Sequence, residues 1–458
     1  MRKVSALLLA TERRAISGLA GLYASRMLGL FMVLPVLALY ADALEGATPL
    51  LVGFALGVYG LTQAVLQIPF GLLSDRIGRK RVIAFGLIIF ALGSIVAAMA
   101  DSIGGIIIGR ALQGSGAVAA AIMALLADQT REQVRTAAMA TIGLSIGVSF
   151  AIAMVVGPWL ASWAGLSGVF WFTALLTLLG LVVLWRWVPP APRRLRHRDV
   201  GLDRQQFKSV IIRPDLWRLD ISIFTLHLVL MAIFVAVPFR LQEAGIPLAH
   251  HGLAYLCIMG LSFVAMVPLM IVGEKKQQIK VVCLLAIGAI AVSLGGLGSP
   301  FSHGHWLFIG LFVFFTGFNL LEATLPSMLS KLAPAGAKGT AMGVYSTSQF
   351  LGAFLGGTLG GLLANVWGLN AVFIGCAVLA LLWWLAMWKM PSPPPLSSEV
   401  VALNDTPPDT LDLLLERLAD VVGVEDVMVV PEEQLVYLKV NRQQLDRDAL
   451  TRLIPPKS

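Results

Sequence analysis

Four ionisable side chains fall inside long apolar stretches of this 458-residue chain, in which Asp, Glu, Lys and Arg make up only 13% of the residues. They are Arg26, Arg110, His227 and Glu322. An ionisable group at membrane depth costs several kcal/mol, so each is a candidate functional group. Glu322 is the one acid that we place in the middle of such a stretch. Because burial favours the neutral form of a carboxyl group, Glu322 could bind and release a proton near neutral pH.

The same residues have structural alternatives. Glu322 is either a proton carrier or a static counter-ion of Arg26 or Arg110, and His227 either titrates near physiological pH or only packs. Arg110 would tune a neighbouring acid or contact the substrate. Further polar side chains on these or neighbouring stretches would line a cavity or bond across helices: Tyr23, Gln63, Gln67, Gln113, Asn319 and Tyr345.

Composition predicts that membrane helices position these side chains. The chain is 57% hydrophobic with a mean hydropathy of +0.83, whereas a soluble domain is normally near half apolar or below. Its apolar blocks can each cross ~30 Å of hydrocarbon, where backbone groups must be satisfied within helices. We expect twelve spans: 15–40, 50–73, 81–100, 103–127, 136–160, 166–188, 216–241, 250–273, 279–299, 304–331, 339–364 and 369–390.

The net charge of +8 orients the protein in the membrane. Lys and Arg gather in alternate connections, as at 76–81, 193–198 and 275–280, while the intervening loops are nearly free of them. This positive-inside pattern predicts that both termini lie in the cytoplasm of a bacterial-type inner membrane, and it argues against nucleic acid as a partner. All three cysteines lie within predicted spans, so we expect no disulfide framework and no metal site.

A weak internal repeat predicts two six-helix bundles, residues 10–190 and 215–390, joined by a cytoplasmic loop at 191–214. Pro35 corresponds to Pro238, Asp75 to Glu274 and Gly109 to Gly310, at offsets of 203, 199 and 201 residues. Repeats in helical transporters typically rock around a site at the membrane midplane.

The composition changes after the last span. A Pro/Ser linker at 391–398 precedes a segment at 399–454 with eleven acids between 405 and 454. Its pattern predicts the order β-α-β-β-α, a small cytoplasmic ferredoxin-like domain without its last strand. The loop DTPPD has no Cys-x-x-Cys, which argues against copper or zinc. The domain would either regulate the membrane part or support its assembly.

The stretch GLLSDRIGRKRVI, residues 71–83, concentrates charge between the second and third spans. Its Gly-x-x-x-Asp-Arg-x-Gly-Arg-Lys pattern resembles the signature loop of the major facilitator superfamily, and the likeness covers roughly residues 10–390. The resemblance implies a gate that latches the two bundles, with Asp75 facing Gly339 and Thr340 and with Asp128 as a further partner. We expect Gly71 and Gly78 to let two helix ends approach closely and turn. The gate residues are Gly71, Asp75, Arg76, Gly78, Arg79, Lys80, Arg81 and Asp128.

Two more stretches carry the resemblance. RALQGSGA, which contains Arg110, is similar to the fourth-helix motif of the superfamily, and VVGPWLA resembles its antiporter-associated motif. Gly157 and Pro158 in the second stretch would allow close packing and a bend, but Ala161-Ser162 replaces the glycine pair of the family. Arg26 stands where several multidrug antiporters of the superfamily carry an acid, which puts a simple preference for cationic drugs in doubt.

The sequence therefore predicts an all-α polytopic membrane protein of the major facilitator fold with a small α+β domain appended. It resembles the twelve-helix drug:proton antiporters, and among them the members with a C-terminal ferredoxin-like cytosolic domain. We expect a monomeric proton-coupled efflux antiporter that contacts a small-molecule substrate, protons and lipids. A proton-coupled importer and a non-transporting membrane sensor are the alternatives. There is no nucleotide-binding loop, so we expect neither an enzyme nor a cofactor, and the proton gradient would supply the energy.

Overall fold

The computed structural model describes residues 9–190, 212–299, 304–333, 338–390, 396–402, 411–430, 435–441 and 444–453. The first half of the membrane part contains α2 (Ala10–Met32), the short 3-10 helix η1 (Leu37–Ala43), α3 (Pro49–Ile77), α4 (Arg79–Ala98), α5 (Ile103–Ser115), α6 (Ala119–Asp128) and α7 (Glu132–Arg186). The second half contains α9 (Pro214–Glu243), α10 (Leu248–Lys275), α11 (Ile279–Leu297), α12 (His305–Leu332), α13 (Lys338–Trp367) and α14 (Leu369–Trp388).

These helices confirm the predicted membrane fold. Eleven helical segments of the described chain are long and apolar enough to cross a membrane. One of them belongs to α7, in which Gly165 has a non-helical backbone (φ 67°, ψ −174°). Since Gly tolerates positive φ at little cost, α7 turns here and holds two of the predicted spans, which makes twelve crossings.

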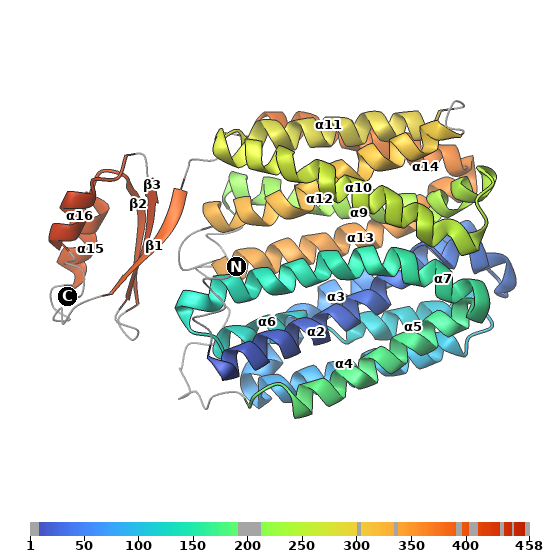
Figure 1. The fold of residues 1–458 in the computed structure, drawn as a ribbon, viewed down its shortest axis with the longest axis horizontal. Helices are drawn as coiled ribbons and strands as arrows, with labels where there is room; N and C mark the ends of the chain where they lie inside the picture. The colour runs from blue at the N-terminus through green and yellow to red at the C-terminus, as the bar shows by residue number, and fades with distance from the viewer. Residues whose placement is uncertain are drawn as a thin grey trace.

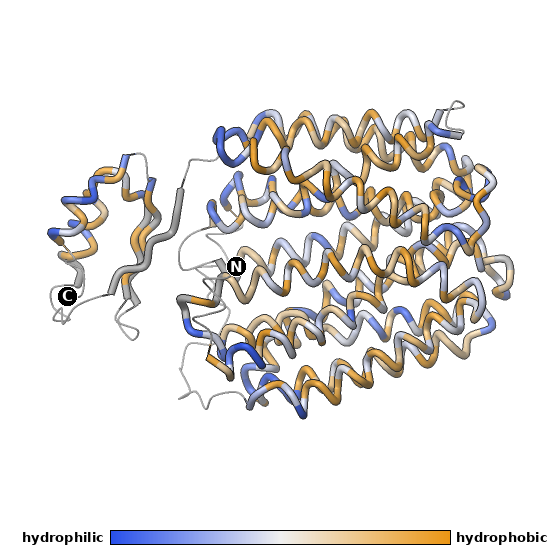
Figure 2. Tube along the Cα trace, in the orientation of Figure 1, coloured by the Kyte–Doolittle hydropathy of each residue, from blue (hydrophilic) through white to orange (hydrophobic). Residues whose placement is uncertain are grey.

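The two halves pack side by side. Figure 1 shows α2–α7 in the lower part of the bundle and α9–α14 in the upper part. Hydrophobic residues run along the helices, and hydrophilic residues gather mainly at their ends (Figure 2). The bundle boundaries remain predictions, because most of the loop expected at 191–214 and of the linker expected at 391–398 lies outside the described residues.

The halves meet at the end that contains η1. A Cβ atom added at Gly53 of α3 would lie 2.1 Å from the carbonyl oxygen of Gly357 on α13, and one added at Gly357 would lie 2.4 Å from that of Gly53. A Cβ atom added at Gly57 would likewise lie 2.4 Å from the carbonyl oxygen of Phe354. Only glycine allows two helix backbones to come this close. The seam between α3 and α13, which we call the glycine seam, therefore closes this end.

The opposite end contains residues 71–81 and the start of α13. Here a Cβ atom added at Gly339 or Gly343 would meet no other heavy atom within 4 Å. The contact between α3 and α13 that holds the η1 end together is thus not repeated at this end.

The C-terminal segment has the predicted order of elements. It consists of β1 (Leu396–Ala402), α15 (Leu411–Ala419), β2 (Val424–Val430), β3 (Leu435–Asn441) and α16 (Arg447–Leu453). The strands form one antiparallel sheet in the order β1-β3-β2, as expected for a ferredoxin-like domain without its last strand. Leu418, Val436, Leu438 and Leu450 form its core, and Figure 1 shows it beyond the helix ends.

Candidate functional site

Three polar side chains from three helices meet in the second half. His227 on α9 places Nε2 3.8 Å from Oε2 of Glu322 on α12. The Nε2 atom of Gln349, on α13, lies 2.8 Å from His227 Nε2 and donates a 3.4 Å hydrogen bond to Glu322 Oε1. His227 Nδ1 lies 3.3 Å from the Ile223 carbonyl oxygen. We call His227, Glu322 and Gln349 the polar triad.

The surroundings of the polar triad are apolar. The ring of Phe318 lies 5.9 Å from that of His227, and Phe318 is buried with Leu321 and Leu325. Asn319, one turn before Glu322 on α12, is also buried, and its Nδ2 has no hydrogen-bond partner. Glu322 Oε2 likewise accepts no hydrogen bond. A polar atom that is buried without a partner is costly. The Glu322 oxygen can therefore accept a proton or a hydrogen bond, and the Asn319 amide can donate to a water molecule or a substrate.

Arg26 lies in the first half, where it is 1% exposed. Its Nη2 atom donates to Gln63 Oε1 at 2.7 Å and to the Gly116 carbonyl oxygen at 3.0 Å. The guanidinium lies over the rings of Phe90 (5.5 Å) and Tyr59 (5.9 Å). Its Nε and Nη1 atoms have no partner.

Arg110 also contacts Tyr59, with its guanidinium 5.2 Å from the centre of the ring. It is fully buried and donates to Gln113 Oε1 at 3.1 Å and to the carbonyl oxygens of Ala55 and Leu56, each at 3.3 Å. Gln113 in turn donates to Ser94 Oγ at 2.9 Å. Arg110 therefore ties α5 to α3 from the inside.

The structure thus separates the four ionisable residues into two clusters. No described acid forms an ion pair with Arg26 or Arg110, and Glu322 contacts His227 instead. The interpretation of Glu322 as the counter-ion of an arginine does not hold in this conformation, because each guanidinium turns into its own half. Tyr23, buried on α2, interacts electrostatically with Arg26 rather than with the polar triad.

Two polar residues of this region were missed by the sequence analysis. Gln349 was not singled out, because an uncharged glutamine among small residues has no distinctive pattern. Asp220 was overlooked as an acid within a span, although it lies inside the predicted span 216–241. It is 9% exposed on α9, and its Oδ1 has no hydrogen-bond partner.

The gate loop is held within the first half. Arg79 forms an ion pair with Asp75, and its Nε lies 3.3 Å from Asp128 Oδ2. Arg79 Nη1 also donates to Ser74 Oγ at 2.8 Å. Gly78 separates α3 from α4 with φ 104°, a left-handed value that favours glycine, as the predicted turn requires.

Other gate residues have different surroundings. Lys80 donates to the Val188 carbonyl oxygen at 2.8 Å and lies over the Trp185 ring, whereas Arg76 and Arg81 are exposed. Gly71 lies inside α3, where an added Cβ would make an ordinary 3.6 Å contact, so the expected close approach at Gly71 is wrong.

Asp75 is not brought to the start of α13. Its ion-pair partner among the described residues is Arg79, and the space around Gly339 is open. The expected contact with Gly339 and Thr340 is absent here because the halves meet at the η1 end instead.

In α7, Gly157 packs against α2, where an added Cβ would lie 2.5 Å from the Met32 carbonyl oxygen. Close packing at this motif is therefore present. The non-helical backbone of α7 lies at Gly165 rather than at Pro158. Gly143 and Gly147, by contrast, have open space around them.

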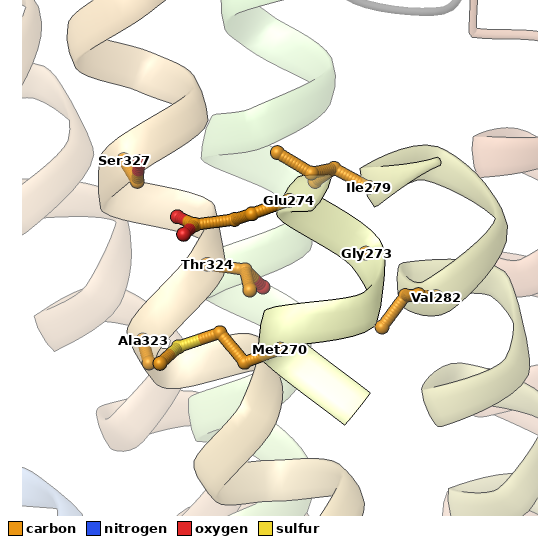
Figure 3. Close-up of a pocket in the computed structure, with 8 residues that line it drawn as sticks. All are labelled: Met270, Gly273, Glu274, Ile279, Val282, Ala323, Thr324 and Ser327. Atoms are coloured by element: carbon orange, nitrogen blue, oxygen red, sulfur yellow. The ribbon is translucent and has the colours of Figure 1, made fainter. Parts of the chain in front are cut away.

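A small pocket lies between α10, α11 and α12. Figure 3 shows Glu274 reaching from α10 toward Ser327 and Thr324 on α12. Thr324 follows Glu322 by two residues, and its hydroxyl lies 3.6 Å from Cys283 Sγ. Glu274, the repeat counterpart of Asp75, thus lines a pocket within its own half.

Comparison with known proteins identifies the family. The profile described as Major Facilitator Superfamily matches residues 19–357 and, in a second overlapping match, residues 280–423. The chain belongs to the Major Facilitator Superfamily. It is 46% identical over 449 residues to the inner membrane transport protein YajR of Escherichia coli K12, a match that covers 97% of each chain. The protein is therefore a multi-pass inner-membrane transporter of this superfamily.

More distant relatives agree with this assignment. The chain is 27% identical over 328 residues to the multidrug resistance protein MdtH of Aeromonas hydrophila, covering 69% of this chain and 79% of that one. Its fold matches a crystal structure of the D-xylose-proton symporter with a TM-score of 0.67 at 17% identity, over 83% of this chain and 98% of that one. The human organic anion transporter MFSD10 matches with a TM-score of 0.60 at 19% identity, over 83% and 100%. These two structural matches support the fold.

Proposed function

We propose that the protein is a proton-coupled secondary transporter that exports small molecules in exchange for protons by alternating access. The observation that carries this proposal is the polar triad, in which an acid with an unpartnered carboxylate oxygen lies 3.8 Å from an imidazole inside the helix bundle. A carboxylate and an imidazole are the two groups most suited to exchanging protons near neutral pH.

In the proposed cycle, Glu322 carries the proton. The protonated acid is neutral, so it can remain in the apolar surroundings without a partner, whereas the carboxylate needs His227 and Gln349 as donors. Gain or loss of one proton therefore changes the contacts between α9, α12 and α13. Such a change can bias the two halves toward opening at one end or the other.

Export rather than import is supported by relatives and by one contact. Relatives named multidrug resistance protein match over two thirds of the chain. The antiporter-type Gly157 also packs directly on the Met32 backbone of α2, so α7 and α2 would move as one unit.

We further propose that both termini face the cytoplasm, which puts the gate loop on that side and the glycine seam on the outer side. The proton gradient would be the energy source. The protein would work as a monomer surrounded by membrane lipids.

The gate would work by exchanging partners. In the present conformation Arg79 forms ion pairs with both Asp75 and Asp128 within the first half. When the cytoplasmic end closes, Asp75 would approach the start of α13 near Gly339 and Thr340. The cost of leaving Arg79 limits how stable the closed gate is.

The proposal is tested in proteoliposomes that enclose a pH-sensitive dye under an imposed pH gradient. Ethidium, chloramphenicol and fluorescein serve as cationic, neutral and anionic probes, added to the wild type, to Glu322→Gln and to the control Glu425→Gln. Glu425 is an exposed acid of the C-terminal domain. We expect a probe to trigger proton movement in the wild type and in Glu425→Gln but not in Glu322→Gln.

The outcomes separate the alternatives. Proton movement opposite to the probe establishes antiport, and movement in the same direction establishes symport and thus import. Equal responses of the wild type and Glu322→Gln would refute Glu322 as the proton carrier. Probes that shift the melting temperature without moving protons or themselves would indicate a sensor.

A further inference from the structure

Asp220 is a buried acid to which the proposed cycle gives no role. It is 9% exposed, its Oδ1 accepts no hydrogen bond, and no described Lys, Arg or His lies within salt-bridge distance of it. The nearest cation along α9, Arg218, instead faces Asp215 at 3.8 Å and lies over Trp217. An ionised carboxylate in such a place is costly, which favours a group that takes up a proton.

The position of Asp220 relates it to the polar triad. It precedes His227 by seven residues on α9. Seven residues are about two helical turns, so both side chains lie on the same face of α9 at levels ~10 Å apart along the axis. Asp220 is the nearer of the two to the start of α9, and therefore to the gate-loop end of the bundle.

Tyr345 on α13 lies at a level between Asp220 and the polar triad, because it precedes Gln349 by one helical turn and Gln349 contacts His227. It is 3% exposed, and its hydroxyl has no hydrogen-bond partner. Tyr345 interacts electrostatically with both Glu322 and Asp220. It precedes Gln349 of the polar triad by four residues, one turn along the same face of α13. A buried hydroxyl without a partner, within electrostatic range of two acids, can connect them.

The other titratable side chains around α9 are the alternatives to Tyr345 as partners of Asp220. The described titratable side chains toward this end, on elements that pack against α9 or directly after them, are Asp75, Arg76, Glu274, Lys275, Glu322, Lys331, Tyr345, Cys376 and Lys389. Of these, Tyr345 interacts electrostatically with Asp220.

We propose that Asp220 is a second proton-binding carboxyl group and that Tyr345 relays protons between it and Glu322. This inference rests on the proposed proton coupling. In the transfer, the carboxyl O–H of Glu322 gives its proton to the Tyr345 hydroxyl oxygen while the Tyr345 O–H gives its proton to the Asp220 carboxylate. Glu322 becomes a carboxylate, Asp220 becomes a neutral acid, and Tyr345 is restored with its hydroxyl rotated.

The relay gives the proton a route of its own. The proton would leave the polar triad along α9 and α13 toward the gate-loop end, while the substrate occupies the space between the two halves. Separate routes allow an antiporter to release a proton before the substrate site is emptied.

The first test needs no substrate. Infrared difference spectra of the full-length protein in lipid, recorded through a pH titration, report the C=O stretch of protonated carboxyl groups. We expect two buried carboxyl bands in the wild type, one missing in Asp220→Asn and the other missing in Glu322→Gln. Asp215→Asn, an acid of the same helix that faces Arg218, is the matched control and should keep both bands. Asp220→Glu should keep two bands with one displaced, which distinguishes loss of the group from loss of folding.

The second test measures proton flux with ethidium, chloramphenicol and fluorescein as probes. Asp220→Asn and Tyr345→Phe should each lower probe-triggered proton flux by at least ~10-fold, the scale of a lost proton-transfer partner. Tyr255→Phe is the control, since Tyr255 also has a buried hydroxyl without a partner in the same half. It should leave the flux unchanged.

A spectrum that loses a band in Glu322→Gln but is unaltered in Asp220→Asn would overturn the second carboxyl and leave the proposed function standing. Unaltered flux in Tyr345→Phe would overturn the relay. If Glu322→Gln also keeps every band and its full flux, Glu322 is refuted as the proton carrier of the proposed function as well.

Discussion

His227 and Glu322, 95 residues apart in the sequence, place Nε2 and Oε2 3.8 Å apart, and Gln349 contacts both. The imidazole and the carboxylate can therefore share one proton, which leaves the pair neutral overall. Neither group has a described partner of opposite charge other than its neighbour. The two side chains therefore depend on each other, and substitution of one alters the surroundings of the other.

We expect Glu322→Gln and His227→Asn each to lower probe-triggered proton flux by about tenfold or more. The double variant should be no slower than the slower single variant, because both substitutions break the same contact. The measurement is a double-mutant cycle of initial proton flux in proteoliposomes. Effects that multiply would show that the two side chains act independently.

The glycine seam predicts a second effect. We expect Gly357→Ala to prevent closure of the η1 end, because its Cβ would lie 2.4 Å from the Gly53 carbonyl oxygen. Spin labels at exposed Ala43 and Val366, in a background with Cys257→Ser, should report a longer distance by double electron–electron resonance. Gly295→Ala on α11, where an added Cβ meets nothing within 4 Å, should leave that distance unchanged. An unchanged distance in Gly357→Ala would show that the seam is not needed for closure.

The gate loop predicts the opposite shift. We expect Asp75→Ala to reduce the population in which the gate-loop end is closed, since that state requires the Asp75 carboxylate near α13. Spin labels at exposed Ile77 and Met342 would measure the two populations. Arg186→Ala, a change of another exposed charge at a helix end, is the control. Equal populations in Asp75→Ala and the wild type would contradict the latch.

An ion pair fastens α2 to the start of α7. Glu12, 3% exposed, accepts hydrogen bonds from Arg131 N (3.0 Å), Nε (2.9 Å) and Nη2 (3.0 Å). The Glu12 carboxylate raises the pKa of the Arg131 guanidinium through its side-chain hydrogen bond, so Arg131 stays charged at any working pH. We expect Glu12→Ala to lower the melting temperature by several degrees, because it removes three hydrogen bonds that a buried carboxylate accepts from Arg131.

The control for this ion pair is Arg13→Ala. Arg13 is an exposed neighbour on the same turn of α2, so its loss should leave the melting temperature within about a degree of the wild type. A thermal shift assay on the purified protein measures both variants. Equal melting temperatures for Glu12→Ala and Arg13→Ala would show that the pair is incidental.

Much of the fold could be predicted because its signals are local. Hydropathy located the twelve spans, and a positive φ at Gly78 matches the turn expected in the gate loop. The β-α-β-β-α order of the C-terminal domain also followed from the spacing of apolar residues. Such features depend only on how one segment interacts with its solvent, so the residues of that segment are enough to predict them.

The candidate site was predicted only in part. Arg26 and Arg110 were correctly recognised as buried charges and Glu322 as an acid within a helix, but sequence could not show that the arginines and Glu322 lie in separate clusters. Asp220 was missed because it lies near the end of a span, where an acid is easily taken for a boundary residue.

The sequence by itself determined that this chain is a helical membrane protein with twelve predicted spans and charged groups within them, since backbone polar groups in lipid must be satisfied within the helix. Only the tertiary structure decided which groups meet. Gln349 contacts His227 and Glu322 across 122 and 27 residues because α9, α12 and α13 pack together. It also decided which end is closed, because the approach of Gly53 to Gly357 depends on how two separate halves dock. Partners across such distances are selected by packing, which no local pattern contains.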